Sequence, residues 1–314
     1  MIRRREALIA LAASALAAGT PAIAQEPAVL RVATLPSDAG SEAFYGIDMG
    51  FFAKAGLNVH LDTQQSGPAI AAAVAGGALD IGFSNTISIA AAHKRGLPFT
   101  FVAPASIYAS SAPTSVLMVR KDSPMRTARD LNGKTIGANA LKNIAQFAPL
   151  AWVDQNGGDA SSLRFVEMPA DEMAVAIEKN RIDAGMMPEP QISEARATCR
   201  VFANAYDAIG DGFMIAGWFA TTAWADAHPD LVRRFAAAMR ETALWANRNP
   251  AQSLPILVKY IKLDPQVARQ VVRARFAEVL TPQIVQPSID IVAHYKVIDA
   301  PYPAQELIYT QYRR

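Results

Sequence analysis

The chain of 314 residues contains a single cysteine, Cys199, so it can form no intrachain disulfide bond. Its four histidines are scattered and show no metal-ligand spacing such as His-x3-His. The glycine patterns of P-loops and dinucleotide-binding folds are missing, and so is the nucleophile elbow of α/β-hydrolases. We therefore expect no catalytic residues, no metal site and no cofactor.

Charged residues are few, and the two signs are balanced. Lysine and arginine number 30, aspartate and glutamate number 28, and no block of basic residues occurs. This balance argues against nucleic acid as a partner and against a polybasic membrane anchor. Because 51% of the residues are hydrophobic, the chain can bury enough core for two lobes of ordinary domain size. The composition indicates a globular protein, which we expect to be a monomer.

An apolar run at the N-terminus, Ala7–Ala18, follows the basic residues Arg3–Arg5. The run is too short to cross a bilayer, and a small-x-small cleavage pattern ends at Ala24. Residues 1–24 therefore have the features of a signal peptide. The arginine pair resembles a twin-arginine motif without all its flanking residues, which leaves Sec and twin-arginine export both open. No cysteine follows the cleavage site to carry a lipid anchor, so we expect a soluble protein of the periplasm.

One short pattern occurs twice, about one domain-length apart. Gly77–Ser84 is echoed by Asn180–Met187, and in each copy an aspartate precedes a short apolar strand with a central glycine. Each copy follows a helix-like segment, so each has the pattern of a helix-to-strand step within its own αβ layer. Two such layers predict two lobes with a crevice between them. In open α/β sheets, ligands bind beyond the carboxyl ends of the strands.

Strand patterns and helix patterns alternate along most of the chain, which predicts an α/β protein with parallel βαβ units. Helix patterns begin at Ser41, with Phe44, Ile47 and Phe51 on one face, and at Gly67. We expect further helices at residues 86–95 and 144–152, a turn leading into a strand at residues 130–137, and strands at residues 29–35, 58–64, 80–84, 99–103, 115–119, 163–167, 182–187, 199–202 and 213–219. Beyond these, Pro229, Pro250 and Pro265 stand where first helical residues would, which predicts a helical C-terminal third.

This order of elements predicts an inserted second lobe. We expect residues 25–118 and 217–314 to form lobe 1, including the C-terminal helical cluster, and residues 119–216 to form lobe 2. The chain would then cross twice between the lobes, near Leu117–Arg120 and near Ala216–Ala220. Two crossings of this kind predict a two-segment hinge.

Four segments, in order, resemble the signatures of one family of periplasmic solute-binding proteins. They are Gly50–Val59, Gly76–Phe83, Asp130–Gly137 and Asp183–Pro190. The family is the nitrate, sulfonate and thiamine-precursor group of ABC importers, described as NMT1/THI5-like or SsuA-like. The resemblance implies a type II periplasmic-binding fold, in which two αβ lobes close on a small-molecule ligand and present it to an ABC permease in the inner membrane.

In such a fold the helix N-termini of both lobes point into the cleft, where small polar residues and aromatic side chains contact the ligand. The candidates at strand-to-helix junctions and at cleft or hinge edges are Ser37, Asp38, Tyr45, Ser66, Ser84, Asn85, Thr86, Tyr108, Asn139, Glu189 and Trp218. Helix capping alone is an alternative role for residues 84–86. For Glu189, stabilisation of a helix N-terminus explains the residue equally well.

Two of these candidates, Asp38 and Glu189, affect which kind of ligand is expected. If both carboxylates faced the cleft, they would repel a bare anion and favour a ligand with N–H donors or positive charge. This reasoning favours a heteroaromatic amine, such as a pyrimidine precursor, over nitrate or a simple sulfonate. The sequence leaves the roles of both residues open.

Two alternatives to a transport protein come from the same resemblance. Pyrimidine-precursor synthases share the fold, but they use a cysteine-rich motif, and this chain has only Cys199. A periplasmic sensor that passes ligand information to a membrane kinase would have the same sequence features. The sequence does not separate a sensor from a transport protein.

Overall fold

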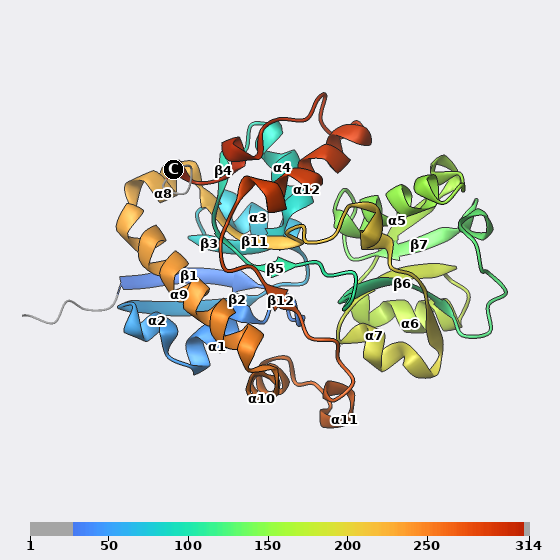
Figure 1. The fold of residues 1–314 in the computed structure, drawn as a ribbon, viewed down its shortest axis with the longest axis horizontal. Helices are drawn as coiled ribbons and strands as arrows, with labels where there is room; N and C mark the ends of the chain where they lie inside the picture. The colour runs from blue at the N-terminus through green and yellow to red at the C-terminus, as the bar shows by residue number, and fades with distance from the viewer. Residues whose placement is uncertain (1–27, 311–314) are drawn as a thin grey trace, which may run out of the picture.

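The computed structural model describes residues 28–310, so the predicted signal peptide lies outside the described part of the chain. Two five-stranded mixed sheets stand side by side, each flanked by helices (Figure 1). The first sheet has the order β2-β1-β3-β11-β4 and comprises β1 (Ala28–Thr34), β2 (Leu57–Thr63), β3 (Ile81–Asn85), β4 (Phe99–Pro104) and β11 (Ala216–Thr221). In this sheet β1 pairs in parallel with β2 and β3, whereas β11 runs antiparallel to β3 and β4.

The second sheet repeats this design. Its order is β10-β6-β9-β7-β8, formed by β6 (Ser115–Arg120), β7 (Thr135–Ala138), β8 (Arg164–Glu167), β9 (Ala184–Pro188) and β10 (Cys199–Ala203). Here β7 pairs in parallel with β8 and β9, and β6 is the antiparallel strand next to β9. The predicted α/β class and the two-sheet architecture are therefore confirmed. A small third sheet joins β5 (Ser106–Ile107) to β12 (Arg275–Phe276).

The repeated aspartate has the same structural role in both sheets. The Asp80 carboxylate accepts the Arg31 N–H at 2.8 Å, and the Asp183 carboxylate accepts the Thr135 N–H at 2.9 Å. In return, the N–H of each aspartate donates to the carbonyl of the same partner residue, at 2.9 Å in both cases. Asp80, directly before β3, is thus joined to the middle of β1, and Asp183, directly before β9, is joined to the first residue of β7. The repeated motif therefore marks the amino-terminal ends of β3 and β9, which lie opposite the carboxyl ends of these strands.

Helices flank both sheets (Figure 1). They are α1 (Glu42–Asp48), α2 (Phe51–Lys54), α3 (Gly67–Ala75), α4 (Thr86–Lys94), α5 (Ile144–Gln155), α6 (Ala170–Glu178), α7 (Gln191–Glu194), α8 (Thr222–Ala227), α9 (Pro229–Arg248), α10 (Pro250–Ile261), α11 (Pro265–Ala268) and α12 (Pro282–His294). Short 3-10 helices occupy Ala128–Leu131, Ala160–Ser162, Ala195–Ala197, Ala205–Ala208 and Ala304–Leu307. No helix within residues 28–310 has the length and apolarity that crossing a membrane requires.

The prolines begin helices as predicted, because Pro229, Pro250 and Pro265 are the first residues of α9, α10 and α11. The long helix α9 packs on β4 and on α1 and α2, so this part of the C-terminal third covers the first sheet. The single helix predicted from Ser41 was wrong. Gly50 adopts a left-handed conformation with φ of 71°, which ends α1 and starts α2 in a new direction.

The connections between the sheets lie before the predicted crossing points. Leu117–Arg120 lies inside β6, which pairs wholly within the second sheet, and Ala216–Ala220 lies inside β11, which pairs wholly within the first. The chain instead passes between the sheets at residues 108–114 and 209–215. The division into lobes at residues 118 and 216 stays a proposal, and these pairings favour moving the boundaries into the two connections.

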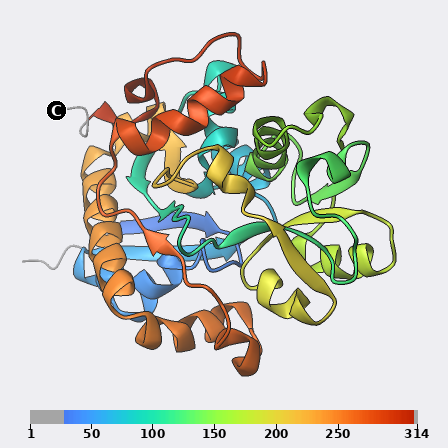
Figure 2. The same ribbon diagram turned by 45° about the vertical axis from the view of Figure 1, so that its right-hand side comes forward.

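The two connections run side by side, as hydrogen bonds between them show (Figure 2). The Tyr108 N–H donates to the Phe213 carbonyl at 2.9 Å, and the Gly212 N–H donates to the Tyr108 carbonyl at 3.1 Å. The Tyr108 ring packs against Tyr206 and Phe213. Paired backbone of this kind can twist as a unit, which suits a hinge.

Candidate functional site

A cavity of about 260 Å³ lies between the two sheets, at the carboxyl ends of their strands. From the first sheet it is lined by residues at or after the ends of β1 and β3, including Leu35, Ser37 and Asn85. From the second sheet it is lined by Asn139, which follows β7, and by Met187 in β9. Because both sheets contribute, a molecule in this cavity would contact both halves of the protein.

Residues at helix N-termini supply part of the polar lining. Asn85 caps α4, and its Oδ1 accepts the Ser88 N–H at 2.8 Å. Asn143 caps α5 by accepting the Ala145 N–H at 2.9 Å, and its Nδ2 donates to Asn139 Oδ1 at 3.0 Å. With these oxygens occupied, the amide nitrogens of Asn85 and Asn139 are the groups left to donate. One lies on each side of the cavity.

Apolar side chains form the rest of the wall. Phe83 and Ile215 lie on the side of the first sheet, and Ile144, Met186 and Met187 lie on the side of the second. Sites of this kind, with an apolar wall and a few convergent polar groups, suit small organic molecules.

The cavity lining carries little charge. Among the described residues that line it, Asp171 in the first turn of α6 is the only charged one, and no lysine, arginine or histidine joins it. Across residues 28–310, no group of three or more His, Cys, Asp and Glu side chains could hold a metal ion.

Three of the predicted ligand contacts, Ser37, Asn85 and Asn139, line the cavity. Ser66 does not, because its hydroxyl accepts the Ala69 N–H and caps α3. Thr86 also does not, because its hydroxyl donates to the Met214 carbonyl at 2.7 Å. Ser66 is therefore a local helix cap, and of residues 84–86, for which capping was the alternative role, Asn85 caps α4 and also lines the cavity.

Ser84 is the fourth small polar candidate, and it lies behind the cavity wall. A Cβ atom at Gly67 would come within 2.3 Å of the Ser84 hydroxyl oxygen, so β3 and the start of α3 touch directly. This close approach requires glycine at position 67 and buries Ser84 completely. The Ser84 side chain thus packs against a helix and does not line the cavity.

The three aromatic candidates also lie outside the cavity lining, because each is buried in the core. Trp218 packs edge-on against Phe83, and its indole N–H donates to Glu42 Oε2 at 2.9 Å. Tyr108 belongs to the first connection, and its hydroxyl donates to Asp207 at 2.7 Å. The Tyr45 hydroxyl bonds to Ser41 and accepts from Arg273. Their predicted stacking on a ligand has no support in this placement.

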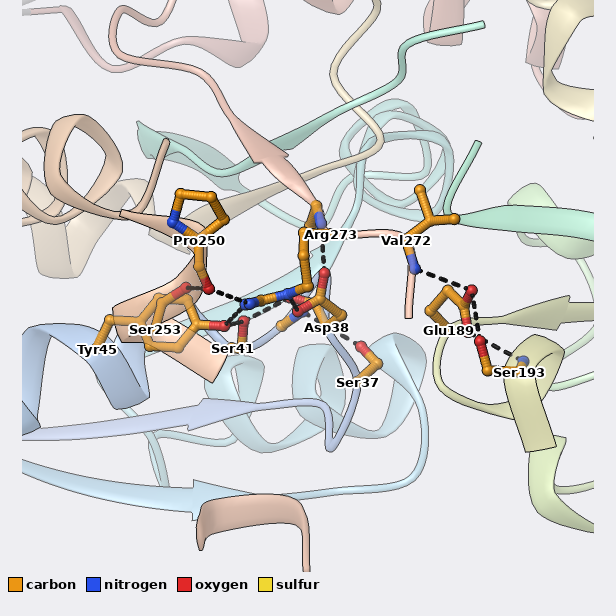
Figure 3. A network of polar contacts seen from close by, with 12 residues as sticks. Ser37, Asp38, Ser41, Tyr45, Glu189, Ser193, Pro250, Ser253, Val272 and Arg273 are labelled. Atoms are coloured by element: carbon orange, nitrogen blue, oxygen red, sulfur yellow. Dashed lines mark hydrogen bonds and ion pairs between the residues drawn. The ribbon is translucent and has the colours of Figure 1, made fainter. Parts of the chain in front are cut away.

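Asp38 is buried in a polar network with Arg273 instead of lining the cavity (Figure 3). Its Oδ1 accepts from Arg273 Nε at 2.9 Å, and its Oδ2 accepts the Ala274 N–H. Arg273 also donates to the Pro250 carbonyl at 2.9 Å. Burial raises the pKa of Asp38, and the Arg273 guanidinium opposes that rise only in part. Asp38 therefore holds a neighbouring chain segment in place.

Glu189 holds the same segment from the second sheet (Figure 3). Its Oε1 accepts the Val272 N–H at 3.2 Å and the Ser193 hydroxyl at 3.1 Å, and its Oε2 accepts the Ser193 N–H at 3.1 Å. Burial raises the pKa of Glu189. We call residues 269–274 the strap, because consecutive strap residues bind Glu189 on one side and Asp38 on the other.

Neither carboxylate lines the cavity, so the prediction that Asp38 and Glu189 contact the ligand has no support here. The reason is that backbone N–H groups and Arg273 of the strap already occupy their oxygens. The preference for a ligand amine that rested on these two residues loses its basis.

The strap contact gives a direct prediction. Replacing Glu189 with alanine removes the acceptor of the Val272 N–H, so we expect that amide to exchange with deuterium about tenfold faster. Hydrogen exchange resolved to residues 269–274 measures this. Glu189→Gln keeps an acceptor oxygen, so the Val272 amide in this variant should exchange at the same rate as in the natural protein. Equal protection in Glu189→Ala would show that the strap does not depend on this bond.

The sequence analysis did not single out several lining residues, namely the polar residues Ser115, Asp171, Gln191 and Tyr206 and the apolar residues of the wall. Gln65 and Asn143, which stand at the same strand-to-helix junctions as Ser66 and Asn139, also line the cavity. Asn143 and Asp171 sit at helix starts, where capping and the helix dipole explain them without a ligand. Their position after strands of one sheet is the signal that could have singled them out.

Comparisons with known proteins agree with this architecture. The model of a family described as NMT1/THI5-like matches residues 41–253. The structure is similar to that of the periplasmic aliphatic sulphonate-binding protein SsuA from Escherichia coli, with a TM-score of 0.74 and 16% identity over 91% of this chain and 99% of that one. It is also similar to the alkanesulfonate-binding SsuA from Xanthomonas axonopodis pv. citri bound to MOPS, with a TM-score of 0.75 and 18% identity over 91% and 99% of the two chains.

The periplasmic nitrate-binding protein NrtA from Synechocystis PCC 6803 is another structural neighbour, with a TM-score of 0.78 and 10% identity over 91% of this chain and 87% of that one. No curated protein matches the sequence. Sequence identities this low show that the fold is shared, but they do not show which ligand this protein binds. The family model spans more than half of the chain, so the protein belongs to the NMT1/THI5-like family and has the fold of periplasmic binding proteins.

Proposed function

We propose that this protein is the substrate-binding protein of an ABC importer, and that it delivers a small organic solute to a permease in the inner membrane. The observation that carries the proposal is the cavity at the strand ends of two sheets, joined by two paired connections and lined from both sides. Membership of the NMT1/THI5-like family and a fold shared with binding proteins of importers support it. Periplasmic location, the signal peptide and a monomeric state belong to the same proposal.

In this proposal the ligand first binds one lobe and then bridges to the other. Its extra contacts in the closed form shift an equilibrium between open and closed states. Residues 108–114 and 209–215 absorb the rotation, because few other backbone segments link the two sheets. Asn85 on one side and Asn139 on the other are placed to contact the same molecule.

Small-angle scattering tests the proposed function. Pyrimidines, sulfonates and aromatic acids are first screened for an increase in melting temperature, and scattering is then recorded with each compound that stabilises the protein. We expect the radius of gyration to fall on binding as the lobes close. Binding that leaves the radius of gyration unchanged would refute closure on the solute.

The two asparagines give a second test. Asn85→Ser keeps a good helix cap and removes the amide nitrogen, and Asn139→Ala removes the corresponding group on the other side. Each change should weaken the binding of a stabilising compound about tenfold, the value of one hydrogen bond. Titration calorimetry measures the affinity. The control is Asn58→Ser, at an exposed position of β2. Unchanged affinity in both variants would remove these residues from the site.

We propose no catalytic activity. The single cysteine, Cys199, is buried in β10, where burial raises the pKa of its thiol and makes the nucleophilic thiolate scarce. If this protein were instead a pyrimidine-precursor synthase of the same fold, the purified protein would show catalytic turnover. A periplasmic sensor differs from the proposed importer protein only in its membrane partner, which co-purification with the permease would identify.

A further inference from the structure

A groove of about 600 Å³ separates the C-terminal part of α5 from α12. Asp154 and Gln155 of α5 line one side of it, and Asp290 and Ile291 of α12 line the other. Figures 1 and 2 show the two helices beside each other. α5 packs against β9 of the second sheet, whereas α12 packs against α4, which covers the first sheet. A change in the angle between the two halves must therefore change the width of this groove.

The groove and the cavity lie at opposite ends of α5. Its first residue, Ile144, and the capping residue Asn143 line the cavity. Its last residues, Asp154 and Gln155, line the groove. α5 has 12 residues, and a helix of that length extends over about 18 Å. One helix of the second half thus spans from one space to the other.

The second connection between the sheets spans the same two spaces. Its first residue, Ile209, lines the groove, and its last residue, Ile215, lines the cavity. Gly210 and Gly212 lie between them, with positive φ values of 144° and 73°. Because backbone at glycine rotates with the least steric hindrance, this stretch is suited to be the pivot of the hinge. The pivot then lies between the groove and the cavity.

Tyr295 of α12 keeps the two helices one side chain apart. Its ring stacks on Phe147 with 5.9 Å between the ring centroids, and its hydroxyl donates to Asp154 Oδ2 at 2.7 Å. A helix that turns about a point between its ends moves those ends in opposite directions, and α5 moves with the sheet on which it packs. When Ile144 moves away from the first sheet and the cavity opens, Gln155 therefore moves toward α12.

We propose that α5 is a lever that couples the groove to the cavity, so that the groove narrows when the lobes open and widens when they close. A bulky group in the groove therefore holds the lobes closed, and a link that draws α5 toward α12 holds them open. A cavity of about 260 Å³ beside a groove of about 600 Å³ is what the closed end of this motion would show. The inference rests on the proposed function and adds to it a surface, remote from the solute, at which closure can be regulated.

Introduced cysteines test the lever, because the natural Cys199 is buried and its thiol is hard to reach. Asp290→Cys, at an exposed position in the groove, is labelled with the large pyrenylmaleimide or with the small N-ethylmaleimide. Gln155→Cys combined with Asp290→Cys is joined across the groove by the short cross-linker bismaleimidoethane. Small-angle scattering of the ligand-free proteins measures the radius of gyration. We expect a smaller radius with the large label than with the small one, and a larger radius for the cross-linked protein than for the same variant capped with N-ethylmaleimide.

Gln283→Cys, at an exposed position of α12 outside the groove lining, is the control and should have the same radius of gyration with either label. The large label acts on open molecules and the cross-link acts on closed ones, so a working lever shifts at least one radius whichever state prevails. A shift in the direction opposite to the expected one, or no shift beyond that of the control in either experiment, overturns the inference.

The same measurements separate the lever from the proposed function. If a screened solute lowers the radius of gyration while both modifications leave it unchanged, the proposed function stands and the lever fails. If the modifications shift the radius as expected and no solute does, the lever stands and the proposed function fails.

Discussion

Replacing Arg273 with alanine is expected to lower the free energy of unfolding by about 3–5 kcal/mol. The change leaves the Asp38 carboxylate fully buried without the guanidinium that pairs with it at 2.9 Å. It also removes the bonds from Arg273 to Tyr45 and to the Pro250 carbonyl. Urea denaturation at neutral pH, followed by circular dichroism, measures the loss.

A matched control is Arg269→Ala, which removes an exposed arginine from the same strap and should cost less than about 0.5 kcal/mol. The double change Asp38→Asn with Arg273→Met removes both charges and should recover most of the loss, because a buried ion pair adds little beyond a neutral pair. A loss for Arg273→Ala no larger than that of the control would mean that the ion pair does not stabilise the fold.

Replacing Glu42 with glutamine is expected to make the protein more stable at neutral pH. Glu42 is fully buried, receives one bond from Trp218 Nε1, and has an Oε1 atom without a partner in the described structure. Burial raises the pKa of Glu42 well above its ordinary value of 4.5. The folded state therefore keeps a proton that the unfolded state loses as the pH rises above that value.

The sign of the effect follows from this proton. Between the unfolded and folded pKa values of Glu42, stability falls as the pH rises, by about 1.4 kcal/mol per pH unit. Glu42→Gln should lack this component, so its advantage over the natural protein should grow between pH 5 and pH 7. Urea denaturation at several pH values measures the difference, with exposed Glu278→Gln as the control. A difference that does not change with pH would show that Glu42 titrates normally.

The order of elements could be predicted because strands and helices have different periods and because proline and glycine mark their ends. The crossing points could not, because an apolar strand pattern does not say which sheet the strand joins. β6 and β11 are both buried antiparallel strands, so their sequences fit either sheet equally well. The split of the first helix depended on the left-handed conformation of Gly50, which glycine permits but does not require.

The cavity lies where the sequence places a crevice, at the strand ends of two sheets, but only three of the predicted side chains line it. Ser37 lines the cavity, whereas its neighbour Asp38 turns to Arg273. Gln191 lines it, whereas Glu189, two residues earlier, turns to Val272. The difference depends on the strap, which comes from about 80 residues or more further along the chain, at a distance that local patterns do not encode.

The two aspartates of the repeated motif lie at one end of the strands, and the residues that line the cavity lie at the other. The bonds that hold each sheet together are therefore remote from the residues that would contact a solute. Asp80 and Asp183 fix the strands at one end, and the cavity is built from the residues that follow the other end. Side chains at the solute-facing end can therefore be exchanged while the aspartate-bonded ends stay intact. In such a scaffold a change of ligand needs altered residues only at the cavity end, where Asn85 and Asn143 would have to be replaced by other helix-capping residues.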